Sequence, residues 1–204
     1  MKNLLKIIPF IFVVLLALSC TTGGEAPIGS VLTFDFDTGS PAASAGQSTP
    51  LSQLVGGVTA YFSSLSDPAA FSIQNQSTTF FTLPQFSGNY LYQNESSRTN
   101  LRITFSQTLT SISLTFATIE YHGVGEVDQP TAIELTAHMD STETPAVGSA
   151  TARGVFPEGY TYPHGTLSFD SGGQPFNVVE IGLLYQQRGV TSFLIDKVVA
   201  ITSP

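Results

Sequence analysis

The 204-residue chain contains one cysteine, no tryptophan and few charged side chains. A single cysteine excludes a disulfide within the chain, so stability must come from the core, with or without a bound ion. Charged residues make up only 11% of the sequence, and stretches rich in Ala, Glu, Lys and Leu are missing. Such stretches are typical of helices, whereas the abundant Thr, Val, Ile and Phe favour strands. The composition therefore indicates an all-β protein.

Basic residues are especially scarce, with 7 Lys and Arg against 15 Asp and Glu. Lys2 and Lys6 belong to an N-terminal leader, and the rest of the chain keeps five basic and fifteen acidic residues, a net charge of −10. Nucleic-acid binding depends on clustered Lys and Arg. This balance argues against a nucleic-acid partner, and equally against electrostatic adhesion to anionic lipid.

The longest apolar stretch lies at the N-terminus. It runs from Ile7 to Leu18 behind the two lysines, and small residues lead into Cys20. This arrangement is typical of a secretory signal. The stretch is also shorter than the roughly 20 apolar residues that span a bilayer.

The leader resembles the signal of a bacterial lipoprotein, which is cut before a cysteine that then carries lipid. The resemblance predicts a signal peptide over 1–19, lipidation of Cys20, a tether over 20–30 and a membrane anchor made by the acyl chains. Thr21 stands where an aspartate retains enterobacterial lipoproteins at the inner membrane, so attachment to the outer membrane is expected. A plain signal peptide that happens to end in cysteine is the alternative.

From residue 31 onward, short segments alternate apolar and polar residues and are broken by Gly, Pro, Ser and Asn, which is typical of half-buried strands. We expect a single antiparallel β-sandwich, jelly-roll-like, with about ten strands over 31–204. Residues 101–105 and 112–116 are predicted to form a hairpin joined by 106–111, residues 50–56 at most one helical turn, and 38–50 and 140–165 long loops. The other expected strands are 32–36, 58–62, 78–83, 90–93, 133–139, 167–169, 179–183 and 193–201.

Two motifs at opposite ends of the body are FDFDTG at 34–39 and FLIDKVVAI at 193–201. Together with SGNYLYQN, the segment 101–121 and GTLSFDSG, they resemble a group of bacterial exported jelly-roll domains and, more distantly, carbohydrate-binding-module and MAM-type sandwiches. In such sandwiches carboxylates of the first and last strands often share a structural calcium ion. The resemblance therefore implies a sandwich fold and a binding function.

Calcium prefers several oxygen ligands at once. Asp35 and Asp37 should share one face of their strand, Asp196 interrupts the last apolar run, and a phase change there predicts a bulge at Asp196-Lys197. With Asn94 as a further oxygen donor, these residues are the predicted ligands of one structural calcium ion. The alternative is that Asp35 and Asp37 face solvent and that Asp196 pairs with Lys197 or caps a turn.

The second predicted site is the loop 154–165, which carries Tyr160, Tyr162 and His164 beside Glu158. Aromatic rings offer a flat apolar face for a sugar, and a carboxylate can bond its hydroxyls. These four residues are therefore the predicted ligand-binding residues. The alternative is that the tyrosines pack the loop onto the sheet.

Catalytic motifs are missing. There is no Gly-x-Ser-x-Gly, and the histidines at 122, 138 and 164 lack the spacing of a transition-metal site. Glu120 and Asp128 could be paired as acids of a glycoside hydrolase, but nothing in the sequence supports the pairing. We therefore expect a non-catalytic module, not an enzyme, that binds a glycan. The alternatives are a structural or adhesive protein-interaction module and, less favoured, a glycan-active hydrolase.

Overall fold

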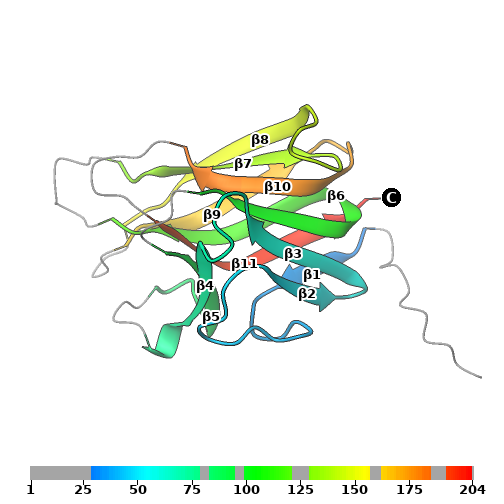
Figure 1. The fold of residues 1–204 in the computed structure, drawn as a ribbon. Coiled ribbons are helices and arrows are strands. Elements are labelled where there is room, and N and C mark those ends of the chain that lie inside the picture. Colours follow the sequence, from blue (N-terminus) through cyan, green and yellow to red (C-terminus); the bar gives the residue numbers. More distant parts are fainter. Residues whose placement is uncertain are drawn as a thin grey trace, which may run out of the picture.

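The computed structural model describes residues 29–78, 83–94, 99–120, 129–156, 162–184 and 192–203. These residues form eleven antiparallel strands and one short 3-10 turn (Figure 1), which confirms the all-β prediction. No helix among them is long and apolar enough to cross a membrane. The elements are β1 (Val31–Phe34), β2 (Leu51–Val55), β3 (Val58–Ser64), β4 (Phe71–Asn75), η1 (Gln76–Thr78), β5 (Asn89–Gln93), β6 (Leu101–Thr118), β7 (Ala132–His138), β8 (Ala146–Arg153), β9 (His164–Asp170), β10 (Phe176–Leu183) and β11 (Phe193–Thr202).

The strands form the two layers of a β-sandwich. The first sheet has the order β2, β3, β6, β10, β7, β8, and the second has β4, β5, β11, β6, β9, with β1 pairing β11 beyond the end of β5. Strand β6 belongs to both, because its first half pairs with β3 and β10 and its second half with β11 and β9. The sandwich is therefore one continuous hydrogen-bonded sheet folded at β6.

The predicted hairpin over 101–116 is wrong, because β6 runs through it as a single strand of 18 residues. The predicted connection at 106–111, SQTLTS, contains no Gly, Pro, Asn or Asp, the residues that are most common in chain-reversing turns. Within β6 the buried side chains change from odd-numbered positions, such as Leu101 and Ile103, to even-numbered ones, such as Ile112 and Leu114. The pairing register with the neighbouring strands shifts in the same region. Such an irregularity lets one strand turn from one sheet into the other.

Other sequence predictions also need correction. Residues 50–56 form β2 rather than a helical turn, and the connection to β3 is Gly56-Gly57, both with positive φ (55° and 86°), as a tight hairpin turn requires. Strand β8 lies inside the predicted loop 140–165; half of its residues are exposed, and the apolar residues that it packs against the core, Val147, Ala150 and Ala152, are small. Strand β4 was not predicted. The predicted strand 78–83 falls largely outside the described residues, and the described Leu83 is not in a strand.

The main core lies between the two layers and is rich in phenylalanine. Phe34 packs against Phe105 with ring centroids 5.8 Å apart, and Phe36 packs against Phe62 at 5.2 Å. A smaller apolar cluster covers the outer face of the second sheet and holds the segment 83–88 against it. Its buried members are Leu83, Phe86, Tyr90, Ala117, Tyr162 and Leu194.

The open edges of the two sheets are treated differently. On one side, the segment 40–49 pairs along β2 through Ser40 and Leu54, and along β4 through Gln47 and Ile73, so both edges are covered. On the other side, β8 ends the first sheet, and no strand of the described residues continues the ladder beyond it.

Candidate functional site

The predicted first-strand carboxylates lie in a turn rather than on a strand. Strand β1 ends at Phe34, and Asp35 Oδ1 accepts hydrogen bonds from the backbone N–H of Asp37 (3.1 Å) and of Thr38 (2.8 Å). Burial raises the pKa of Asp35, but the bonds from Thr38 and Asp37 outweigh it and leave that pKa below its ordinary value. Asp37 Oδ1 accepts the backbone N–H of Asn89 at 2.9 Å.

The bulge predicted at Asp196-Lys197 is confirmed. Ile195 pairs with Phe116 and Val198 with Leu114, so two residues of β11 oppose the single residue Thr115 of β6. Asp196 is 3% exposed, and its Oδ1 accepts the backbone N–H of Ser87 at 3.3 Å.

Three carboxylates influence one another at this bulge. Burial raises the pKa of Asp196 to about 6. The N–H of Ser87 and the charge of Lys197 oppose this rise, whereas the charges of Asp37 and Asp35 add to it. The first and last strands are therefore close enough for their acidic residues to interact, as the sequence motifs suggested.

The residues predicted to bind calcium do not all converge. Asn94 lies at the far end of β5 from the bulge, roughly 13 Å along the strand from the residue opposite Asp196, and it bonds Ser72 and Ala69. Calcium takes six to eight oxygen ligands. Within the described ranges, no three His, Cys, Asp or Glu side chains form a group that could hold a metal ion. Calcium at Asp35, Asp37 and Asp196 stays a prediction.

The predicted sugar-binding loop is only partly described. Tyr162 is 3% exposed and belongs to the apolar cluster under segment 83–88, and His164 is buried at the start of β9. The exposure predicted for these two side chains is therefore wrong; Tyr162 packs the loop onto the sheet. Tyr160 and Glu158 lie outside the described residues, as does Cys20.

Two more predictions concern polar residues. Glu120 is buried, and its carboxylate accepts bonds from the Thr118 hydroxyl (2.5 Å) and from the N–H (2.8 Å) and hydroxyl (3.2 Å) of Thr131. These bonds give Glu120 a structural role, and Asp128 lies outside the described residues. His138, one of the three histidines considered from the sequence, is buried at the end of β7, where its Nδ1 lies 2.9 Å from the carbonyl oxygen of Thr144.

A groove of about 450 Å³ lies on the outer face of the second sheet. Its floor crosses three neighbouring strands, because Thr166 on β9 pairs with Thr115 on β6, and Ser113 on β6 pairs with Val199 on β11. Segment 83–88 contributes Gln85 from one side. The lining residues are Gln85, Ser113, Thr115, Thr166, Lys197 and Val199.

Among the described residues that line this groove, Lys197 is the charged one. The bulge places it beside Thr115, and its side chain is exposed. It makes no hydrogen bond or ion pair with any residue that the structure describes. By contrast, Arg153 donates to the carbonyl of Pro130, and Arg102 is paired with Glu180.

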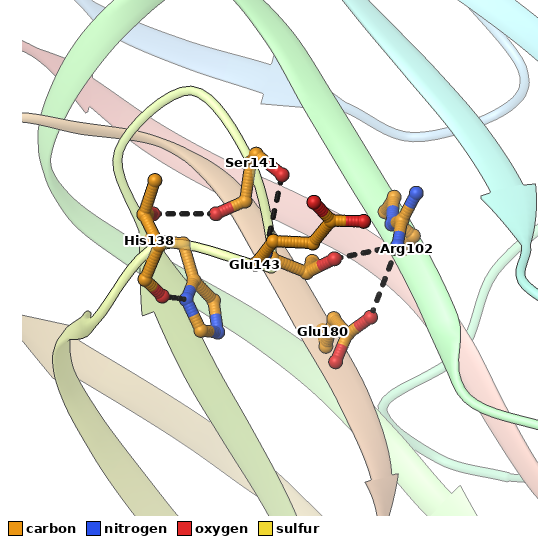
Figure 2. A network of polar contacts seen from close by, with 7 residues as sticks. Arg102, His138, Ser141, Glu143 and Glu180 are labelled. Atoms are coloured by element: carbon orange, nitrogen blue, oxygen red, sulfur yellow. Dashed lines mark hydrogen bonds and ion pairs between the residues drawn. The ribbon is translucent and has the colours of Figure 1, made fainter.

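The outer face of the first sheet has a different character. Its pocket is about 70 Å³ and is lined in part by Glu134 and Glu180. Figure 2 shows Arg102 reaching from β6 toward Glu180 on β10 (3.4 Å) and toward the turn after β7, where the Thr142 hydroxyl accepts its second bond at 2.7 Å. This face uses its cation to hold a turn in place.

The fold is similar to the K2 cleaved adhesin domain of Lys-gingipain, with a TM-score of 0.52, 10% identity, and coverage of 84% of this chain and 99% of that domain. Lower scores relate it to a carbohydrate-binding module of family 29 (TM-score 0.30, 14% identity, 71% and 90% covered). They also relate it to the module CBM32-2 of a GH31 protein bound to GalNAc (0.33, 13%, 68% and 80%). No protein-family model matches the chain, and no curated protein matches it. At these identities the likeness concerns the fold alone.

The described residues of the groove offer hydroxyl, amide and ammonium groups on a sheet, and none of them is aromatic. Serine and threonine hydroxyls both donate and accept hydrogen bonds, and Gln85 adds an amide with both capacities. Such a surface suits a ligand with many hydroxyl groups. The sequence carries a signal for this lining, because ISLTF and GTLSF alternate buried apolar residues with Ser and Thr. Asp196 of the bulge was predicted as a site residue, whereas Lys197 was not.

Proposed function

We propose that the protein is a non-catalytic glycan-binding module, and that the groove across β9, β6 and β11 is its binding site. The groove carries this proposal because it combines about 450 Å³ of open volume with polar side chains from three paired strands. Ligand sites of this size with a few placed polar groups are common. Strands also hold such groups more firmly than loops do.

The lining favours binding over hydrolysis. A glycoside hydrolase needs two carboxyl groups flanking the bond to be cleaved. None of the described residues that line the groove is acidic, and the nearby Asp196 is 3% exposed. Glu120, the acid considered from the sequence, is held by Thr118 and Thr131. We infer that a bound saccharide is retained rather than cleaved.

We also propose that lipid on Cys20 attaches this module to a bacterial outer membrane. The proposal rests on the leader, with its two lysines, its apolar stretch and a single cysteine. Labelling with radioactive fatty acid should mark the wild type and not Cys20→Ala. An unlabelled wild type that is recovered in the soluble fraction would refute the anchor.

The structure also favours a second candidate, an adhesive protein-interaction module. The observation is strand β8, an edge strand of eight residues with exposed Ser149, Thr151 and Arg153 and no proline. An unpaired edge can accept a strand from a partner. Substitution of Thr151 by proline removes a backbone N–H, so it should weaken the binding of a partner strand while leaving glycan binding intact.

A glycan array with and without calcium distinguishes the two candidates. Retention of specific glycans, lost when the groove is filled, would support the glycan-binding proposal. Uniformly flat arrays in both conditions would overturn it and favour the protein partner.

A further inference from the structure

We propose that the groove selects acidic saccharides, those carrying a carboxylate or a sulfate, and that Lys197 is the residue that recognises the acidic group. This inference rests on the proposed glycan-binding function and names the class of its ligand. It follows from two features of the groove as the described residues form it: an ammonium group without an ion-pair partner among them, and a lining of hydroxyl groups to which none of them adds an aromatic ring.

The first feature is the placement of the cation. In a chain with a net charge of −10 outside its leader, Lys197 is exposed and lines the groove, and among the described residues no carboxylate lies within ion-pair distance of it. Arg102 shows the alternative, since its guanidinium bonds Glu180 and Thr142. The bulge that aims Lys197 at the groove interrupts the ladder of β11, and such bulges commonly re-aim a side chain at a site.

The second feature is the lining around Lys197. Neutral sugars are commonly held by stacking on an aromatic ring. The groove has hydroxyl groups from Ser113, Thr115 and Thr166, the amide of Gln85 and the edge of Val199 instead. A charge-assisted hydrogen bond is stronger than a neutral one. An acidic substituent would therefore compensate for the missing ring.

Nearby carboxylates oppose an anion, and their positions limit that opposition. Asp35 follows Phe34, the partner of Val198, so it lies beside the bulge, but on the side of β11 away from β6 and β9, where the groove lies. Its carboxylate accepts the N–H groups of Asp37 and Thr38, and Asp37 accepts that of Asn89. Asp196 is adjacent to Lys197 in the bulge, but it is buried and directed to the N–H of Ser87. Its charge should weaken anion binding, so removing that charge should strengthen binding. Asp196→Asn is therefore a variant for which a gain of affinity is expected.

The test uses the purified protein and pairs of oligosaccharides. Each pair holds an acidic oligosaccharide, rich in galacturonate, glucuronate or sulfated sugar, and its carboxyl-reduced or desulfated counterpart. Calorimetric titration should give tighter binding of an acidic member. Lys197→Gln should weaken that binding about five- to tenfold and weaken binding of the neutral counterpart by a clearly smaller factor, and Lys197→Arg should restore the binding of the acidic member. Asp196→Asn should strengthen it about two- to fivefold, and added salt should weaken it.

The outcomes separate this inference from the function beneath it. Equal binding of both members of every pair, or a Lys197→Gln variant that binds the acidic member like the wild type, would overturn the acidic preference and leave glycan binding in place. Binding of no member of any pair would overturn glycan binding itself. Arg153→Gln, which removes an exposed cation away from the groove, is the matched control and should change neither affinity.

Discussion

The two outer faces of this sandwich each carry a cation on a strand, and they use it in opposite ways. On the first sheet, Arg102 is bonded to Glu180 and Thr142 and holds the turn after β7. The pocket on this face measures about 70 Å³ and is lined in part by Glu180. On the second sheet, Lys197 is exposed in a groove of about 450 Å³ and has no ion-pair partner among the described residues. The Arg102 guanidinium is thus bonded within the protein, whereas the Lys197 ammonium is exposed in a groove.

The difference follows from local chain geometry. Regular pairing sets Glu180 of β10 opposite Arg102 of β6, so the two charges meet across the ladder. At the bulge, Asp196 and Lys197 both oppose Thr115, and the buried Asp196 bonds Ser87, which leaves Lys197 over the groove. The extra residue in β11 therefore separates the two charged side chains of the bulge: Asp196 is buried and bonded to Ser87, and Lys197 is exposed in the groove.

Filling the groove should have the largest effect on the comparison. Thr166 is exposed on β9, so Thr166→Trp should leave the fold stable to within about 0.5 kcal/mol. The indole would occupy the volume of the ligand and weaken glycan binding at least about 100-fold, about 2.7 kcal/mol. Titration calorimetry measures the affinity. Thr151→Trp, on the other sheet, is the control, and equal losses in both variants would make the two faces equivalent.

The next effect concerns the buried Asp196, whose pKa is raised to about 6 from 3.8. The folded state then holds its proton more tightly than the unfolded state, so this group lowers stability as pH rises from about 4 to 6, and the loss is complete above pH 6. In EDTA, Asp196→Asn should be more stable than the wild type by about 2 kcal/mol at pH 7 and equal to it near pH 3.5. Urea unfolding across this pH range measures the difference. A constant difference at every pH would contradict the assignment.

The two cations should differ in their contribution to stability. Arg102→Met removes a bond to Thr142 and leaves Glu180 without its partner, so unfolding should become easier by about 1 kcal/mol. Lys197→Met should change the unfolding free energy by less than about 0.5 kcal/mol. Chemical denaturation of both variants tests this order. A larger loss for Lys197→Met would show that its ammonium has a structural partner.

Calcium gives the smallest expected effect. If the three carboxylates bind it with the weak affinity of extracellular modules, 1 mM calcium should raise the Tm of the wild type by about 1 to 4 °C. Asp37→Asn should lose that rise. Melting curves that coincide in calcium and in EDTA would end the calcium prediction.

The fold class could be predicted because inward-facing apolar residues recur with period two in most strands, as in Ile133, Leu135 and Ala137 of β7. Strand β8 was not predicted, because half of its residues are exposed and those that face the core are small, so the apolar alternation is weak. The hairpin error at β6 arose because a strand that changes sheets shifts its apolar phase, and a phase shift alone resembles a break between two strands.

The site was harder to predict than the fold. The bulge at Asp196-Lys197 could be predicted because an apolar run changes phase there. The burial of Tyr162 could not, because it depends on Leu83 and Phe86, which lie some eighty residues earlier in the sequence. The groove likewise depends on the lateral order of β9, β6 and β11, and that order is a property of the tertiary fold rather than of any local motif.

The most direct test of the glycan-binding groove is an NMR titration of the isotope-labelled protein with the tightest-binding oligosaccharide. Binding in the groove predicts that the backbone amides of Ser113, Thr115, Thr166, Lys197 and Val199 shift most, with those of Glu134, Thr136 and Glu180 unchanged. Shifts concentrated on the first sheet, or along β8, would contradict it.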